Sequence, residues 1–214
     1  MRPAASLLLF PLILVSGSAL KAQSPHMGFS LNLTIPTGDF ASKSYPDWVP
    51  PQKETYDSGL GGSFTISFPT DRNLAFRLNL SGSSENGTNH ATGYTNLHLQ
   101  HSMFSVGGDL QIFPQGTAFR HRGLYFVAGL SADIERFNAS QGSDPGYYPD
   151  YTTNKTRLGG SVGIGHSFGY DAGMRFTMEA TFHKTLTGTD ANANTGDLPM
   201  PNADFVKLGF GFVF

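Results

Sequence analysis

The 214-residue chain contains no cysteine, which excludes a disulfide framework, a lipid-attachment cysteine and a thiolate metal site. Lys and Arg number 14 against 16 Asp and Glu, so the formal net charge of -2 provides no basic field for a nucleic acid. Charged residues make up only 14% of the chain, whereas an average soluble domain has about a quarter. The sequence therefore predicts a protein without covalent cross-links and without a nucleic-acid partner.

Long apolar runs are also missing. The apolar run Leu7–Val15 is far shorter than the ~20 residues that a membrane-spanning helix needs, and no later stretch approaches that length. This run follows an arginine and precedes a series of small residues, an order that is typical of a secretory signal peptide. We predict a signal peptide over residues 1–22, cleaved after Ala22 or alternatively after Ala19, followed by one exported domain over residues 23–214.

Glycine, with 26 residues, and aromatic residues, at 13%, are abundant. Gly, Phe, Asn and Thr in excess are poor helix formers and suit strands and loops. Apolar residues alternate with small or polar ones, and this period of two is that of side chains along a β-strand. The expected strands lie at about 26–35, 58–69, 74–81, 96–113, 123–136, 156–169, 174–187 and 205–214.

The last of these segments shows the alternation most clearly. Phe210, Phe212 and Phe214 share one parity with other apolar residues, while Lys207 and two glycines occupy the other. The apolar face is too continuous for a water-facing sheet, and the small face has too little apolar volume for the core of a sandwich. This pattern predicts a strand whose apolar side chains face lipid and whose polar side chains face inward.

The segment at 96–113 departs from this regularity. Its apolar residues are odd-numbered up to Met103 and even-numbered from Phe104 onward, with few exceptions. The change of parity predicts either a β-bulge near Ser102–Phe104 or an upper part of the strand that projects beyond the membrane.

The connections between the segments alternate in length. Short turns alternate with long polar stretches at 36–57, 82–95, 137–155 and 187–202. Outer-membrane barrels have this arrangement, with the short turns in the periplasm, and their sheet must close because backbone groups in lipid must all be paired. We therefore predict an all-β, eight-stranded antiparallel up-and-down transmembrane β-barrel. The alternative, a soluble eight-stranded barrel, would need a more strongly polar outer wall than Gly, Ser and Thr provide.

On these features the chain resembles the small eight-stranded outer-membrane barrels of the OmpA/OmpX kind, and in particular the outer membrane protein β-barrel domain group. The resemblance rests on the signal peptide, on the Ile35–Phe40 exit of the first strand and on the aromatic last strand. It implies the outer membrane of a Gram-negative-type bacterium and insertion by the barrel-assembly machinery, with Phe210, Phe212 and Phe214 as the assembly signal. The fold alone implies no activity, because it hosts adhesins, anchors and enzymes.

An eight-stranded barrel has an interior that side chains just fill, so its inward charges are expected to pair. Heights counted from the short turns give the neighbours Arg77 with Asp109, Glu135 with Arg157, and Glu179 with Lys207 and His183. The remaining members of the predicted lumenal charge network are Asp133 and Arg175. We expect this network to have a structural role.

Motifs for catalysis or metal binding are few. His98 and His101 are an odd number of residues apart, so a regular strand places them on opposite faces. A lipid hydrolase needs a His and a Ser within hydrogen-bond reach, whereas the adjacent His166 and Ser167 face opposite ways. We predict no catalytic, cofactor-binding or metal-binding residues; a lipid-modifying enzyme and a minor pore are the alternatives.

The function that these observations favour is a structural or surface-interaction role exerted through the long loops. The expected contact residues in the loops are Tyr45, Trp48, Tyr147, Tyr148 and Tyr151. Amphipathic aromatic residues of this kind are common in binding surfaces. We expect a monomer that contacts outer-membrane lipid, takes an extracellular ligand through its loops and uses no cofactor.

Overall fold

The computed structural model describes residues 24–44, 52–91, 97–141, 151–169, 173–187 and 202–214. The strands in these ranges are β1 (His26–Pro36), β2 (Ser42–Ser44), β3 (Gln52–Tyr56), β4 (Gly59–Pro69), β5 (Leu74–Ala91), β6 (Leu97–Ile112), β7 (Gly123–Gln141), β8 (Tyr151–Phe168), β9 (Arg175–Thr185) and β10 (Phe205–Val213). Two short helical turns, α1 (Gly38–Ala41) and η1 (Ala118–Arg120), lie between them. None of the helices in the described ranges has the length and apolarity needed to cross a membrane.

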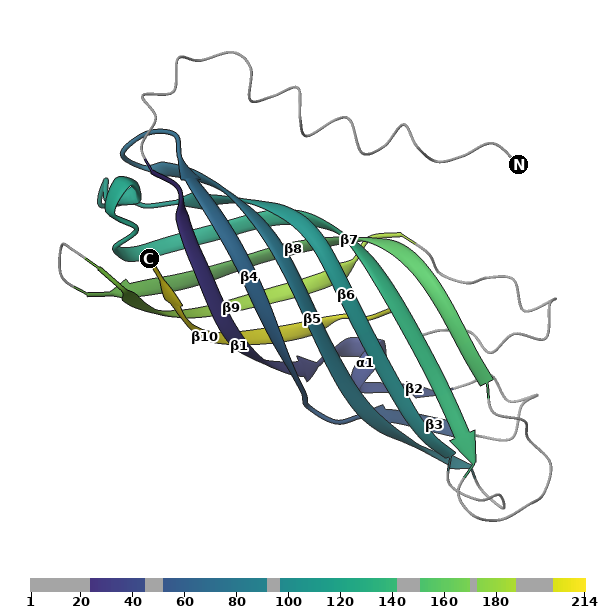
Figure 1. Ribbon diagram of the computed structural model, residues 1–214. Helices are drawn as coiled ribbons and strands as arrows, with labels where there is room; N and C mark the ends of the chain where they lie inside the picture. Colours follow the sequence, from purple (N-terminus) through teal and green to yellow (C-terminus); the bar gives the residue numbers. More distant parts are fainter. Residues whose placement is uncertain (1–23, 45–51, 92–96, 142–150, 170–172, 188–201) are drawn as a thin grey trace, which may run out of the picture.

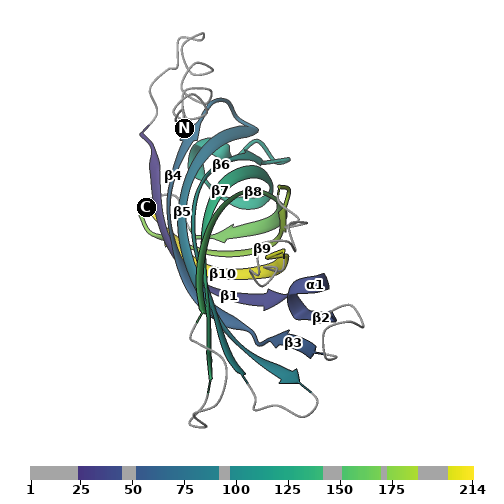
Figure 2. The same cartoon turned by 90° about the vertical axis from the view of Figure 1, so that its right-hand side faces the viewer.

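Eight of these strands form a closed antiparallel barrel, as the alternation predicts. Each of β1 and β4–β10 pairs with a neighbour on both sides; β10 pairs with β9 and β1, and the β5–β6 pairing closes the sheet. Strands β2 and β3 form a small hairpin attached to the edge of β5. Figures 1 and 2 show the tilted strands, with η1 and the end of β10 at one end and α1, β2 and β3 at the other.

Three barrel strands extend farther than the sequence predicts. β5 continues to Ala91, β7 continues to Gln141 and β8 begins at Tyr151, so parts of the expected loops 82–95 and 137–155 are strand. The prediction ended these strands where the apolar alternation ends. Backbone pairing does not require apolar side chains, and a polar outer face is favourable where the sheet meets water, so the ladder continues into the polar sequence.

The bulge predicted near Ser102–Phe104 is absent. The register is continuous through Ser102, Met103 and Phe104, each of which faces one residue of β5 and one of β7. The change of parity instead reflects a change in the interior, because Leu99 and Met103 are buried in it. The second expectation, an upper part with a different environment, fits this strand.

We call the end of the barrel with η1 the lower end and the end with α1, β2 and β3 the upper end. From the lower end to the middle of the barrel the outer wall is apolar, and the described side chains follow the predicted orientation. Leu31 is 76% exposed, whereas the inward Arg77 is 6% exposed. The other outward apolar residues include Phe29, Leu78, Leu80, Phe104, Leu130, Val162, Phe182, Phe210 and Phe212. An apolar surface that surrounds a closed barrel is the surface that contact with lipid requires.

Polarity is reversed at the upper end of the barrel. Gln100 and Arg136 face outward and are exposed, while inside the barrel lies a buried cluster of Phe40, Tyr56, Leu99 and Phe137. The Phe40 ring of α1 stacks on the Tyr56 ring at 4.6 Å. This end has a polar outside, and its inside contains this apolar cluster, as in a soluble barrel. We refer to it as the upper extension.

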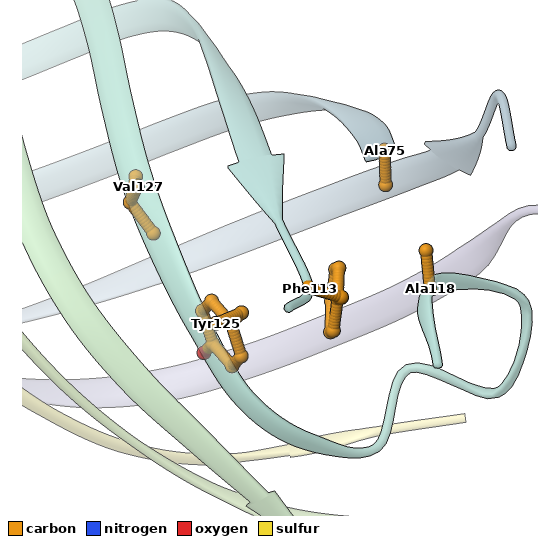
Figure 3. Close-up of a cluster of buried hydrophobic side chains, with 5 residues drawn as sticks. All are labelled: Ala75, Phe113, Ala118, Tyr125 and Val127. Atoms are coloured by element: carbon orange, nitrogen blue, oxygen red, sulfur yellow. The ribbon is translucent and has the colours of Figure 1, made fainter. Parts of the chain in front are cut away.

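The opposite end is closed by the connection between β6 and β7. A second buried cluster consists of Ala75, Phe113, Ala118, Tyr125 and Val127, whose side chains converge under the barrel in Figure 3. His121, which follows η1, adopts the left-handed conformation with φ of 43°. This turn directs its ring between those of Phe113 and Tyr125, at 5.3 and 5.4 Å.

Candidate functional site

The middle of the barrel interior is organised around one arginine. Arg77 of β5 faces Asp109 directly across the β5–β6 ladder, and its guanidinium lies 2.8 Å from that carboxylate. The same guanidinium lies 2.6 Å from Glu179 of β9, on a strand that is not its neighbour. The Tyr125 hydroxyl also donates to Glu179, at 3.0 Å. The ion pairs therefore connect three strands through the interior, and the tyrosine hydrogen bond adds a fourth.

The predicted pairing of Glu179 with Lys207 is replaced by this arrangement. Lys207 is opposite Thr181, two residues from the position of Glu179 in the β9–β10 register. Its ammonium group lies near the Arg77–Glu179 pair but forms no direct ion pair within the described ranges. The long arginine side chain reaches across the narrow interior, and its guanidinium binds a carboxylate through two nitrogens, which the single ammonium nitrogen of a lysine cannot do.

A second group of charges lies above the first. His183 approaches Asp133 at 3.1 Å, and Arg157 approaches Glu135 at 3.6 Å. The carboxylates of Asp133 and Glu135 are fully buried. Arg175, the remaining predicted member, is buried at the lower end of β9.

Two members of this upper group were missed by the sequence reasoning. His101 Nδ1 lies 2.9 Å from Glu85, His101 Nε2 lies 3.7 Å from Glu135, and the Thr34 hydroxyl donates to Glu85 at 2.7 Å. Glu85 has the same parity as Arg77, and His101 has the same parity as Asp109. The inward parity identifies Glu85 if the strand at 74–81 is continued beyond residue 81. It identifies His101 if the same inward parity is kept along the whole segment 96–113.

His101 belongs to the upper extension, where the neighbouring outward residues of β6 are Gln100 and Ser102. Burial alone would lower the pKa of His101, but the nearby Glu135 carboxylate and the hydrogen-bonded Glu85 carboxylate outweigh burial and raise the pKa to about 8. His101 is therefore a cation at neutral pH and compensates part of the buried acidic charge.

The lower end contains a histidine of opposite character. Burial, with the nearby charges of His26 and Arg77, lowers the pKa of His121 to about 3. Its Nε2 lies 3.4 Å from the Gln111 amide nitrogen, and the His26 ring nitrogen lies 3.1 Å from the Phe119 carbonyl. The ring of His121 is neutral and functions as part of the aromatic cluster that closes this end.

Two voids lie between these side chains. Their volumes are about 30 and about 40 Å³, and Lys207 lines both. Roughly 10–15 Å³ of such space holds one water molecule, so each void has room for roughly two or three. A Cβ on Gly159 would collide with the Asp133 carboxylate, and one on Gly165 would collide with the Tyr125 ring.

The proposed assembly signal lies on the outer face at the closing strands. Phe210, Phe212 and Phe214 are exposed, and Phe214 exchanges two backbone hydrogen bonds with Met27 at the end of β1. The Phe214 ring stacks on Phe29, with the ring centroids 6.0 Å apart. Recognition of these three residues during assembly stays a prediction.

The loop contact residues and the signal peptide are not placed by the structure. Tyr45, Trp48, Tyr147 and Tyr148, together with residues 1–22, lie outside the described residues. Tyr151 begins β8, but its side chain also lies outside the description.

The residue pairs considered for a hydrolase and for a metal site, His166 with Ser167 and His98 with His101, each lie on opposite faces of their strand. The His166 ring packs on Phe168 at 4.2 Å on the outer face, while Ser167 is buried on the inner face. His98 is exposed and His101 is buried, so they occupy opposite faces. Within the described ranges, no group of three or more His, Cys, Asp or Glu residues could hold a metal ion.

One solved structure shares this fold, and two others show a weaker similarity. The outer membrane protein OprG from Pseudomonas aeruginosa is 16% identical, with a TM-score of 0.56 over 89% of this chain and 95% of that chain. The attachment invasion locus protein Ail of Yersinia pestis, solved with the heparin analogue sucrose octasulfate, is 11% identical, with a TM-score of 0.48 over 89% and 97%. Neisserial surface protein A is 11% identical, with a TM-score of 0.45 over 88% and 94%. At these identities the likeness to OprG shows the fold alone.

A comparison with curated proteins finds no match. The sequence profile of the family described as "Outer membrane protein beta-barrel domain" matches residues 7–214, which is nearly the whole chain. With the closed eight-stranded sheet and its apolar outer wall, this match establishes that the chain belongs to the outer membrane protein β-barrel domain family.

Proposed function

We propose that this chain is a monomeric outer-membrane barrel with a filled polar interior, and that it acts as a structural or surface-interaction protein through its extracellular segments. Its export would use the predicted signal peptide, and its insertion would use the barrel-assembly machinery. The observation that carries the proposal is the set of ion pairs that crosses the interior, because it leaves the outside of the barrel as the surface available to a partner.

A filled interior is supported by the charges and the voids together. The Arg77–Glu179 contact joins strands that are not neighbours in the sheet, and each of the interior voids near it has room for only roughly two or three water molecules. Above it, α1 and Tyr56 cover the interior with the buried aromatic cluster of the upper extension. A solute that crossed the barrel would have to break these contacts.

A role at the cell surface is supported by the upper extension. β5, β6, β7 and β8 continue beyond the apolar wall, and their outward residues there include Gln100, Asn138 and Thr152. The connection between β7 and β8 contains Tyr147 and Tyr148, and the connection that precedes β3, which pairs with β5, contains Tyr45 and Trp48. A rigid scaffold that presents variable segments is a common arrangement of binding proteins.

The proposal is tested by exchanging extracellular segments. Residues 45–51 and 142–150, which contain Tyr45, Trp48, Tyr147 and Tyr148, would be replaced by Gly-Ser linkers of equal length, and partners on the cell surface would be captured by cross-linking. We expect capture to be lost in this variant and retained in a control in which residues 188–201, a segment without aromatic residues, are replaced in the same way.

Three results would contradict the proposal. Unchanged partners after both aromatic segments are replaced would exclude binding through these segments. Unitary conductance of the purified protein in a planar bilayer would exclude the filled interior and favour a pore, while turnover of phospholipid or lipid A by the refolded protein would favour an enzyme.

A further inference from the structure

The apolar outer wall has one pronounced groove, which spans β10, β1, β4, β5 and β6. Its volume is about 610 Å³, and its walls consist of apolar side chains. The side chains around it are Phe29, Leu31, Phe64, Leu80, Phe104 and Phe210. We call this feature the outer groove; it is separate from the interior and from the extracellular segments.

The floor of the outer groove results from two outward glycines on adjacent strands. Leu31 faces Gly62, Gly62 faces Gly82, and Gly82 faces Phe104 along one row of the sheet. Two other outward glycines of the wall, Gly108 and Gly160, are covered by the side chains of Phe76 and Leu186, which a Cβ at either position would meet at 3.0 Å. Two missing side chains in the middle of the row leave a hollow between the leucine and the phenylalanine.

The fold does not require glycine at these two positions. Neither residue has a positive φ. A Cβ on Gly62 would meet only the Ser30 carbonyl at 3.5 Å, and one on Gly82 would meet only the Met103 carbonyl at 3.7 Å, both ordinary van der Waals distances. Several inward glycines, such as Gly61 and Gly163, would by contrast collide with the neighbouring backbone. The glycines at 62 and 82 therefore maintain the hollow rather than the barrel.

The chemistry of the outer groove excludes a polar ligand. The backbone of Gly62 and Gly82 is engaged in the strand ladders on both sides, and the Ser30 and Ser63 hydroxyls bond to each other at 2.6 Å. The nearest outward polar groups are the exposed Ser84 and Ser102, whose hydroxyls lie 3.4 Å apart just above the groove. A ligand would thus have a hydrocarbon body in the groove and a polar end near these hydroxyls.

We propose that the outer groove binds one hydrocarbon chain of an outer-leaflet lipid, with its polar end towards Ser84 and Ser102. The groove is continuous with the lipid-facing wall, and it runs from the base of the upper extension towards Phe29 and Phe212. In a bilayer such binding gives no hydrophobic gain, because the hydrocarbon chain is already surrounded by lipid. The hydrocarbon chain is therefore held by van der Waals contacts with the phenylalanine rings and the glycine floor of the groove.

The size of the groove favours an acyl chain over a second copy of the protein. A methylene group is about as large as a water molecule, so at about 30 Å³ each the groove has room for on the order of twenty methylene groups. A leucine side chain from a second barrel would fill about a fifth of this space. Two barrels also have convex walls, which meet along a narrow strip and leave the rest of the hollow empty.

The test is a lipid titration followed by native mass spectrometry of the full-length protein in detergent micelles. The probe is palmitoyl-oleoyl phosphatidylglycerol. We expect a first lipid adduct at low lipid concentration in the wild type, and an apparent Kd for it that is at least tenfold weaker in the double variant Gly62→Leu/Gly82→Leu. The control Ala132→Leu adds a similar side chain to the outer wall of β7, outside the groove, and should change this Kd less than twofold.

Further experiments distinguish recognition of the hydrocarbon chain from recognition of the headgroup. They also distinguish a loss of binding from a folding defect. Phosphatidylcholine with the same chains should bind within threefold of phosphatidylglycerol, and glycerophosphoglycerol, which has no chains, should not compete. The milder variant Gly62→Ala/Gly82→Ala, which adds only van der Waals contacts, should weaken the first adduct about threefold and retain the native β-sheet circular dichroism even if the leucine variant does not fold.

Three results would overturn the proposal. Equal first-adduct affinity in the wild type and both double variants would show that the groove holds no lipid chain. Competition by glycerophosphoglycerol would show that a headgroup is recognised instead. A wild-type dimer that is lost in Gly62→Leu/Gly82→Leu, with lipid binding unchanged, would identify a second copy as the occupant.

Discussion

Replacement of Arg77 by methionine tests whether the central ion pairs stabilise the barrel. The guanidinium lies 2.8 Å from Asp109 and 2.6 Å from Glu179, and all three side chains are largely buried. Methionine has a comparable length but no charge, so both carboxylates would lose their bonded cation. Removing one partner of a buried ion pair costs about 3–5 kcal/mol, because it leaves an uncompensated buried charge.

The measurement is urea unfolding of the protein in lipid vesicles, followed by circular dichroism. With a urea dependence of about 1–3 kcal/mol per molar, the loss corresponds to a midpoint on the order of 2 M lower than in the wild type. A matched control is Asn79→Ala, on the same face of β5 and two residues farther along. Among the described residues the buried Asn79 Oδ1 has no hydrogen-bond partner, and the expected loss is about 1 kcal/mol or less.

A variant with balanced charges tests the same ion pair. In Arg77→Met/Glu179→Gln one charge of each sign is removed, Asp109 and the nearby Lys207 stay as opposite charges, and an uncharged replacement of a buried ion pair is often neutral in stability. This double variant should therefore recover most of the free energy of unfolding that Arg77→Met loses. A single variant within about 1 kcal/mol of the wild type, or a double variant no more stable than the single one, would refute this assignment.

Two other predictions concern the upper histidine and one glycine. Because the pKa of His101 is raised from 6.5 to about 8, its contribution to stability is fully present below about pH 6.5 and is lost as the pH rises through 8; the loss is about 2 kcal/mol. Thermal unfolding between pH 6 and 9 should show this decrease in the wild type, whereas the same slope in His101→Gln would assign it to another group. Gly165→Ala should lower the free energy of unfolding by about 1–3 kcal/mol, because its Cβ would collide with the Tyr125 ring and move the hydroxyl that donates to Glu179. Tyr125→Phe, which loses the hydroxyl without the collision, should lose about 1–2 kcal/mol, and a stable Gly165→Ala would show that the ring can move freely.

The sequence predicts the architecture well because one local signal is repeated in every barrel strand. Alternation with a period of two identifies a strand and assigns its two faces, and the closure of the sheet follows from the need to pair every backbone group in lipid. The contacts Arg77–Asp109 and Glu135–Arg157 lie on adjacent strands, so heights counted from the turns were sufficient to place them together.

The same signal is insufficient where the environment changes along a strand. In 96–113 the inward face is polar at Asp109 and apolar at Leu99, so apolar parity alone could not distinguish a bulge from a change of solvent. For the same reason the apolar alternation predicts that this strand ends at residue 81 and that Glu85 lies in a loop, whereas β5 continues and Glu85 points inward. Apolar alternation identifies a strand only along the part whose outer face contacts lipid.

By itself, then, the sequence determined a closed eight-stranded barrel with an apolar outer wall, because alternation and backbone pairing are properties of each strand and its neighbours. Only the tertiary structure decided that Glu179 binds Arg77 rather than Lys207, since that contact crosses the interior between strands that are not adjacent. It also decided that Gly62 and Gly82 come together in one outward row. Each is an ordinary glycine in the sequence, and the hollow exists only because the register of β4 and β5 places one beside the other.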